Sequence, residues 1–119
     1  MYGLSKNVDL SFLSGVELQQ VCIGRNEVIL NFDQDVRITV LSSLAVSCER
    51  GTPPTRYDDV VIGGSMVLPL LHDAVSEAEA TDEGGLLLAF ASGGTIIVFD
   101  DSDQYESFWI AHGKEQIIA

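Results

Sequence analysis

Two stretches of the chain alternate apolar and polar residues in the manner of β-hairpins. In the first, Val28–Phe32 and Val36–Val40 flank a short polar turn, and in the second, Leu86–Phe90 and Thr95–Val98 flank a glycine turn. β-Branched and aromatic residues at alternate positions around such turns are typical of paired strands. The two hairpins also coincide at a constant offset of 58 residues. The matched apolar positions are Val28 with Leu86, Leu30 with Leu88, Phe32 with Phe90, Ile38 with Ile96 and Val40 with Val98.

The similarity continues upstream of the hairpins at an offset of 57, where Leu13–Leu18 aligns with Leu70–Val75. We therefore predict an internal duplication over approximately residues 10–48 and 66–111, with a linker at 49–64 that contains paired prolines and glycines. Each unit would hold a helical turn, a strand, a hairpin and a trailing strand, the last at 44–48 or at 105–111. The predicted fold is one mainly β domain over residues 1–119, with two related βββ(β) units forming a sandwich or a partly open barrel.

One short helix is expected near residues 65–72, after the linker. Ser65 is a suitable N-cap, and Pro69 fits the first turn. By propensity alone a helix could run from Met66 to Ala80, because apolar residues recur there at helical spacing. The repeat predicts instead that the helix stays short and that a strand begins near Ala74, and we follow the repeat.

Composition and charge exclude several classes of protein. The 119 residues are 46% hydrophobic and 20% charged, which is typical of a folded globular chain. The formal net charge is -12. Proteins bind nucleic acids and anionic membranes through Lys and Arg side chains, so we expect neither as a partner of this acidic chain. No apolar run approaches the ~20 residues of a membrane-spanning helix, and the start of the chain lacks the apolar core of a signal peptide. A cytoplasmic location is therefore expected.

The negative charge is concentrated in the second half of the chain. Residues 1–56 carry five basic and six acidic side chains, whereas residues 57–113 carry eleven acidic ones and no Lys or Arg. A charged surface of this kind keeps a small protein in solution. It also suits docking of a cationic partner, because a patch of one sign steers association. The sequence leaves both interpretations open.

Carboxylate clusters at Asp100, Asp101 and Asp103 and at Asp33 and Asp35 offer ligands for a hard cation such as calcium. The calcium-loop pattern also requires a glycine within the loop and a closing glutamate, and neither follows Asp100 at the required place. Turn formation by aspartate side chains explains these clusters without a ligand. We predict no metal site and no cofactor.

Catalytic motifs are absent from the sequence. Cys22 and Cys48 show no zinc or redox spacing and are expected to be small buried hydrophobic residues. Ser65 follows two glycines but lacks the later glycine of a hydrolase nucleophile elbow. His72 and His112 have no metal-binding neighbour at helical spacing. We predict no catalytic residues.

Two groups of residues are candidates for binding. Arg56, Tyr57 and His72 could line a polar pocket between the two units, but we favour an ordinary loop for the first two and a capping or surface role for the histidine. The second group combines acidic side chains with aromatic ones that can anchor an interface. Within a strand, Trp109 would point away from the side on which Phe108 and Ile110 enter the core. The predicted partner-binding residues are Asp100, Asp101, Asp103, Tyr105, Glu106 and Trp109.

One further pattern is spread over most of the chain. Its residues are Tyr2-Gly3-Leu4, Asp9-Leu10-Ser11-Phe12-Leu13, Gly15, Val21-Cys22-Ile23-Gly24, Phe32, Leu70-Leu71, Gly84, Leu86, Leu88, Phe90, Asp100 and Tyr105-Glu106-Ser107. In these residues the chain resembles a family of small bacterial proteins known only as a domain of unknown function. The resemblance implies a fold and a bacterial origin, and no activity. His72 departs from the glycine expected after the paired leucines, Leu70 and Leu71, of that pattern.

We expect a non-enzymatic acidic protein that docks a basic protein, of a toxin-neutralising or regulatory type. The alternative is a small-ligand-binding domain or an enzyme with its site between the two repeats. The apolar C-terminal residues 116–119 and the repeated strand edges also make a homodimer a reasonable expectation.

Overall fold

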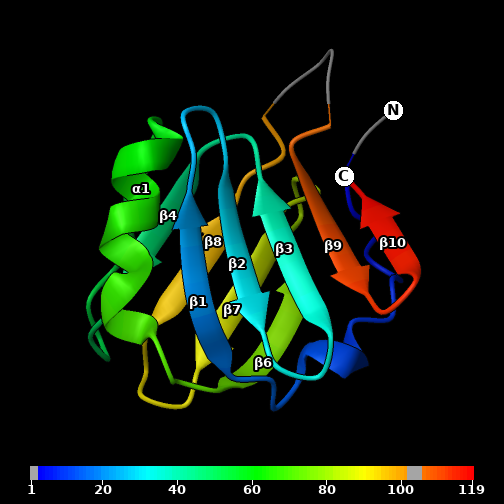
Figure 1. The fold of residues 1–119 in the computed structure, drawn as a ribbon, viewed down its shortest axis with the longest axis horizontal. Helices are drawn as coiled ribbons and strands as arrows, with labels where there is room; N and C mark the ends of the chain where they lie inside the picture. Colours follow the sequence, from blue (N-terminus) through cyan, green and yellow to red (C-terminus); the bar gives the residue numbers. More distant parts are fainter. Residues whose placement is uncertain (1–2, 102–105) are drawn as a thin grey trace.

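The computed structural model describes residues 3–101 and 106–119 and is mainly β (Figure 1). Ten strands form two five-stranded antiparallel sheets that pack face to face and stay open at their edges, so the predicted β-sandwich is confirmed. Sheet I has the strand order β1-β2-β3-β9-β10, and sheet II has the order β5-β4-β8-β7-β6. The strands of sheet I are β1 (Leu18–Ile23), β2 (Val28–Phe32), β3 (Val36–Val40), β9 (Phe108–His112) and β10 (Glu115–Ile118). Those of sheet II are β4 (Leu44–Ser47), β5 (Thr55–Tyr57), β6 (Val75–Ala80), β7 (Leu86–Phe90) and β8 (Thr95–Val98).

The alternation seen in the sequence builds the core between the sheets. Strands β2 and β7 share one burial pattern, in which every second side chain is buried. Leu30 and Leu88, at matched positions, are completely buried. On β9, Phe108 and Ile110 enter the core while Trp109 faces outward, as the sequence predicts. Each buried apolar side chain of this size contributes about 1.5–3 kcal/mol by leaving water.

The trailing strands are exchanged between the sheets. Strand β4 follows β3 along the chain but pairs with β8, and β9 follows β8 but pairs with β3. Each sheet therefore contains three strands from one half of the chain and two from the other (Figure 1). The sequence did not predict this exchange, which makes each half necessary to complete the sheet of the other.

The two halves make matching hydrogen bonds where they meet. The Gly15 amide donates to the Val75 carbonyl at 2.7 Å, and the His72 amide donates to the Leu18 carbonyl at 2.7 Å. These bonds are exchanged by the same offset of 57 that relates Gly15 to His72 and Leu18 to Val75. Gly15 and His72 also share a left-handed backbone, with φ of 89° and 72°. The paired contacts support an internal duplication, which itself stays a prediction.

The helix begins earlier than the sequence predicts. Helix α1 spans Val60–Val67 and continues into the 3₁₀ turn η2, Leu68–Leu70, whereas a helix near 65–72 with Ser65 as its N-cap was expected. The N-cap is Asp59, whose carboxylate accepts the Val61 amide at 2.9 Å. Ser65 lies within the helix, where its hydroxyl donates to the Val61 carbonyl at 2.9 Å. The strand expected from Ala74 is confirmed by β6.

Tertiary packing explains the early start of α1. Its first residues are β-branched or glycine, which are poor helix formers, so propensity favoured a later start. A Cβ atom on Gly63 would lie 2.6 Å from Leu44 Cδ2, and one on Gly64 would clash with Val28. The two glycines therefore let α1 press against the sandwich. The region 49–64, predicted as a linker, contains β5 and the first half of α1.

Candidate functional site

The structure describes four of the six predicted partner-binding residues, namely Asp100, Asp101, Glu106 and Trp109. The Asp100 carboxylate accepts the Ser107 hydroxyl at 3.1 Å, so it supports the chain around it. Asp101 pairs with Arg56 at 3.0 Å. The other predicted members are Glu106, which is half-buried, Trp109, which lies on the outer face of sheet I, and Asp103 and Tyr105, which lie outside the described residues.

Trp109 sits in a hollow of about 240 Å³ on the outer face of sheet I. Arg37 and Gln116 line the same hollow from the strands on either side. The indole nitrogen of Trp109 is buried and has no hydrogen-bond partner among the described residues. Asp101 lines a different hollow from the one that holds Trp109.

The structure does not bring together the residues of the predicted pocket. Arg56 and Tyr57 are neighbours on β5, and the Arg56 guanidinium lies 4.2 Å from the centre of the Phe99 ring. His72 lies at the junction of the two halves, with its Nδ1 atom 3.6 Å from Glu17. Main-chain hydrogen bonds and a bridge between Glu17 and Ala74 close this junction. None of the three residues lines the groove at β6, the hollow beside Asp101 or the two hollows around Arg37 on sheet I.

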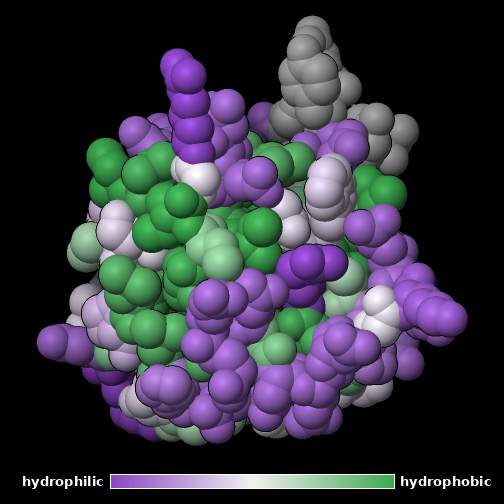
Figure 2. All heavy atoms as spheres, viewed as in Figure 1, coloured by the Kyte–Doolittle hydropathy of each residue, from purple (hydrophilic) through white to green (hydrophobic). Residues whose placement is uncertain are grey.

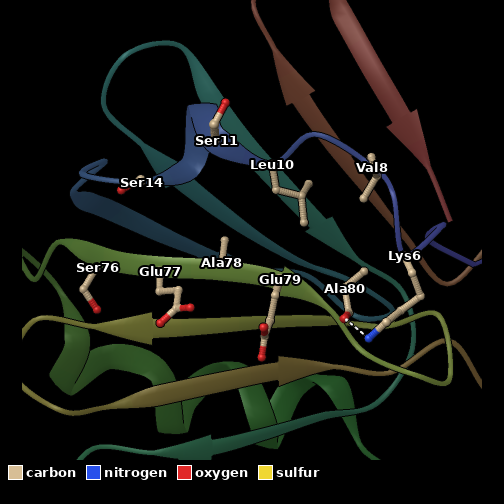
Figure 3. Close-up of a pocket in the computed structure, with 10 residues that line it drawn as sticks. All are labelled: Lys6, Val8, Leu10, Ser11, Ser14, Ser76, Glu77, Ala78, Glu79 and Ala80. Atoms are coloured by element: carbon tan, nitrogen blue, oxygen red, sulfur yellow. Dashed lines mark hydrogen bonds between the residues drawn. The ribbon is translucent and has the colours of Figure 1, made fainter.

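A groove runs along the outer edge of sheet II. Residues 76–80 of β6 form one wall, and residues of the segment 6–14, from Lys6 to Ser14, form the other (Figure 3). The groove encloses about 320 Å³. On the β6 side, Ala78 points toward the N-terminal segment, whereas Glu77 and Glu79 point away from it (Figure 3). Serine and charged side chains therefore line much of the groove, Val8, Leu10 and the alanines of β6 add an apolar part, and Glu77 and Glu79 form an acidic outer rim.

The main chain of β6 is only partly paired. The Phe90 amide donates to the Gly94 carbonyl, and the Ala91 amide donates to the Ala74 carbonyl. Along β7, the main-chain amides and carbonyls of the odd-numbered residues therefore point toward β6. By the same alternation, Glu77 and Glu79 pair with β7, while the main-chain groups of Ala78 face the groove. The groups of Ala80 point the same way, and its carbonyl accepts the Lys6 ammonium at 3.2 Å.

Three main-chain groups on this edge have no partner among the described residues: the amide and carbonyl of Ala78 and the amide of Ala80. An edge strand with free groups of this kind is a template for pairing with another chain. This free edge of β6, together with the groove beside it, is the candidate functional site.

The charges around the groove are strongly unbalanced. Glu77, Glu79, Asp82 and Glu83 are all exposed on β6 and on the turn that follows it. Lys6 is the cation beside them, with its ammonium 2.9 Å from the Asp82 carboxylate. The hydrogen bond from Lys6 lowers the pKa of Asp82, and the hydrogen bond to Asp82 raises the pKa of Lys6. The edge therefore keeps a net negative charge at neutral pH.

Other chemistry is sparse in the part of the chain that the structure describes. Residues 3–101 and 106–119 contain no group of three or more His, Cys, Asp or Glu side chains placed to hold a metal ion. Cys22 and Cys48 are free and half-buried, where the sequence predicted buried thiols. Burial raises the pKa of the Cys48 thiol, and neighbouring Glu49 adds to the effect, which disfavours the reactive thiolate. No helix of these residues is long and apolar enough to cross a membrane.

Figure 2 shows the face of the molecule that carries sheet I and α1. Apolar side chains gather over α1 and the adjoining strands β1 and β2, and hydrophilic ones cover the opposite side of this view. The exposed apolar side chains of this region are Ile23, Ile62, Met66 and Leu68.

The groove at β6 was not predicted from the sequence. The alternation of Glu77, Ala78, Glu79 and Ala80 could have suggested a strand with an acidic outer face. Which edge of that strand stays free depends on the order of strands in the sheet, and a single sequence does not give that order.

One of three comparisons with known proteins found a match. A family model described as a family of unknown function (DUF6188) matches residues 10–119. No curated protein and no solved structure matches the chain.

Proposed function

The chain belongs to this family of unknown function, and we propose that it is a non-enzymatic protein that binds a positively charged protein through the acidic edge of sheet II. The observation that carries the proposal is the accumulation of four exposed carboxylates beside the groove at the edge of sheet II: Glu77 and Glu79 on β6, and Asp82 and Glu83 on the turn that follows it. Among the ion pairs of the described residues, the one that these carboxylates make is between Asp82 and Lys6. A surface of one sign accelerates encounter with a partner of the opposite sign.

The distribution of charge along the chain supports the same proposal. Residues 57–113 contain no Lys or Arg, so the whole of β6, β7 and β8 is free of basic side chains. A basic partner would therefore meet no repulsive group from these strands. A toxin-neutralising or regulatory role fits such a protein, because docking alone can block or tune the activity of the partner. The two free thiols fit a cytoplasmic setting.

The test is retention of basic proteins by the wild type and by a variant that lacks the charges of the edge. The variant combines Glu77→Gln, Glu79→Gln and Glu83→Gln, and it keeps Asp82 because Asp82 pairs with Lys6. Each protein is immobilised, incubated with lysate at low salt and eluted at high salt, and the eluates are compared by quantitative mass spectrometry. Loss of three rim charges is expected to weaken specific association by about tenfold.

A matched control removes the same number of charges elsewhere. The control combines Glu27→Gln, Glu49→Gln and Glu115→Gln, whose side chains make no ion pair within the described residues. It should retain the same basic proteins as the wild type. Equal retention by the edge variant and the control would show that proteins are held by net charge alone, and the proposal would be wrong.

A further inference from the structure

The free edge of β6 has a covered counterpart in the same molecule. At the offset of 57, β1 corresponds to β6, and helix α1 at 60–67 corresponds to the segment 3–10. Helix α1 packs beside β1, where a Cβ on Gly64 would lie 3.4 Å from Ile23 Cγ1. The segment 3–10 contains neither helix nor strand and leaves the groove open. The second position therefore holds only the irregular segment 3–10, which leaves part of the edge of β6 open within the described chain.

The segment 3–10 is held at both ends of the groove. At one end the Leu4 amide donates to the Gly84 carbonyl at 2.7 Å, and at the other end Leu10 is buried in the core. Lys6 bonds to Ala80 and Asp82 between these points. Strand β6 thus bounds the groove on one side and the anchored segment 3–10 bounds it on the other. The free main-chain groups of Ala78 lie in the middle of the groove.

We infer that the basic partner inserts an extended segment into this groove and adds a sixth strand to sheet II along β6. The inference rests on the proposed function and adds the mode of binding to it. Strand addition supplies affinity through main-chain hydrogen bonds, and the flanking side chains set the specificity. Residues 76–80 of β6 span about 17 Å of strand at about 3.3 Å per residue, so the inserted segment pairs over about five residues.

The side chains around the edge define the sequence of the occupant. Side chains of an added strand point alternately to the two faces of the sheet. On the outer face they lie beside Glu77 and Glu79, where Lys or Arg forms favourable cross-strand pairs. On the inner face they meet Ala78 and the apolar side chains of Val8 and Leu10. The occupant is therefore an extended segment in which basic and apolar residues alternate.

The experiment uses the full chain and a defined probe, the capped pentapeptide Lys-Val-Lys-Val-Lys. Hydrogen exchange of the Ala78 amide is measured by NMR with and without saturating peptide at low salt. The Ala78 amide should exchange at least about tenfold more slowly in the complex, because it becomes hydrogen-bonded to the added strand. Val21, the equivalent residue of β1, is the internal reference and should not change.

Two altered partners test the role of the main chain separately from charge. Peptides N-methylated only at the lysines or only at the valines keep the charge of the probe but lose the amides on one edge. One of the two should bind about tenfold more weakly than the other, since only one edge faces β6. The Ala78→Pro variant removes the amide that faces the groove and should lose peptide binding to a similar degree. If this variant fails to fold, the N-methylated peptides still test the role of main-chain hydrogen bonds with the wild-type protein.

Each outcome decides the inference. Binding that leaves Ala78 unprotected, equal binding of both N-methylated peptides, or no binding of the probe would overturn strand addition. Protection of Ala78 that rises with protein concentration without peptide would place a second copy on the edge and would overturn it too. None of these results bears on the proposed function, which fails only if the edge carboxylates do not affect retention of basic proteins.

Discussion

Replacing Gly15 with alanine is expected to destabilise the fold although the added methyl group meets no other atom. Gly15 has φ of 89°, and a Cβ atom built there has nothing within 4 Å. The expected loss of stability therefore comes from backbone conformation and not from a steric clash. An L-residue in the left-handed region costs about 1–2 kcal/mol, and alanine recovers about 0.4–1 kcal/mol by restricting the unfolded chain. The net loss is about 1 kcal/mol.

The prediction becomes sharper as a series at the two equivalent positions. Gly15→Asn should cost less than Gly15→Ala, because asparagine tolerates the left-handed region. His72 has φ of 72°, and its side chain is 75% exposed, so its contact with Glu17 contributes little. His72→Gly should therefore be neutral or stabilise the protein by up to about 1 kcal/mol.

Thermal unfolding followed by circular dichroism measures the series. For a chain of 119 residues, a loss of about 1 kcal/mol lowers Tm by about 4 °C. Gly51→Ala is the control, since Gly51 has φ of 82° and open space around it but lies away from the junction of the halves. It should show a similar loss. A Gly15→Ala protein that melts at or above the wild-type temperature would refute the reasoning.

Three further predictions concern single groups. Asp59→Ala removes the N-cap of α1 and should cost about 1 kcal/mol in urea unfolding, whereas Ser65→Ala should change stability little. Lys6→Met should raise the pKa of Asp82 toward its ordinary value of 3.8, as measured by NMR titration. In the wild type the ion pair stabilises the fold above pH 3.8, and this contribution is lost as the pH falls through the lowered pKa of Asp82. If the substitution leaves the pKa of Asp82 unchanged, the ion pair is contradicted. The Cys48 thiol should react with a disulfide reagent at pH 7 more slowly than free cysteine, because burial raises its pKa.

Local patterns in the sequence predicted the strands of the core well. Alternation at Leu30 and Leu88 places both side chains in the interior, and the outward direction of Trp109 followed from the same period. These predictions succeeded because burial on one face of a strand imposes its period directly on the residues. The choice of strand over helix for β6 rested on the repeat, which carried information that propensity alone did not.

Features that depend on contacts between distant residues were beyond this reasoning. The exchange of β4 and β9 leaves no local mark, because a strand has the same pattern in either sheet. The start of α1 depends on close approach of Gly63 and Gly64 to the sandwich, and helix propensity predicts the opposite. The groove at β6 depends on both the strand order and the path of the segment 3–10.

The acidic residues of β6 resolve a conflict that every open strand edge presents. A free edge that can accept a partner can equally accept a second copy of its own chain, and proteins commonly guard such edges with charge. If two identical chains paired edge to edge through β6, Glu77 and Glu79 of one chain would lie close to the same glutamates of the other. Like charges across a strand pair are destabilising. The same carboxylates attract a segment that carries Lys or Arg at alternate positions. In the proposed mode of binding, one set of side chains therefore disfavours self-association and favours a basic partner, at the edge of sheet II that no helix covers as α1 covers β1.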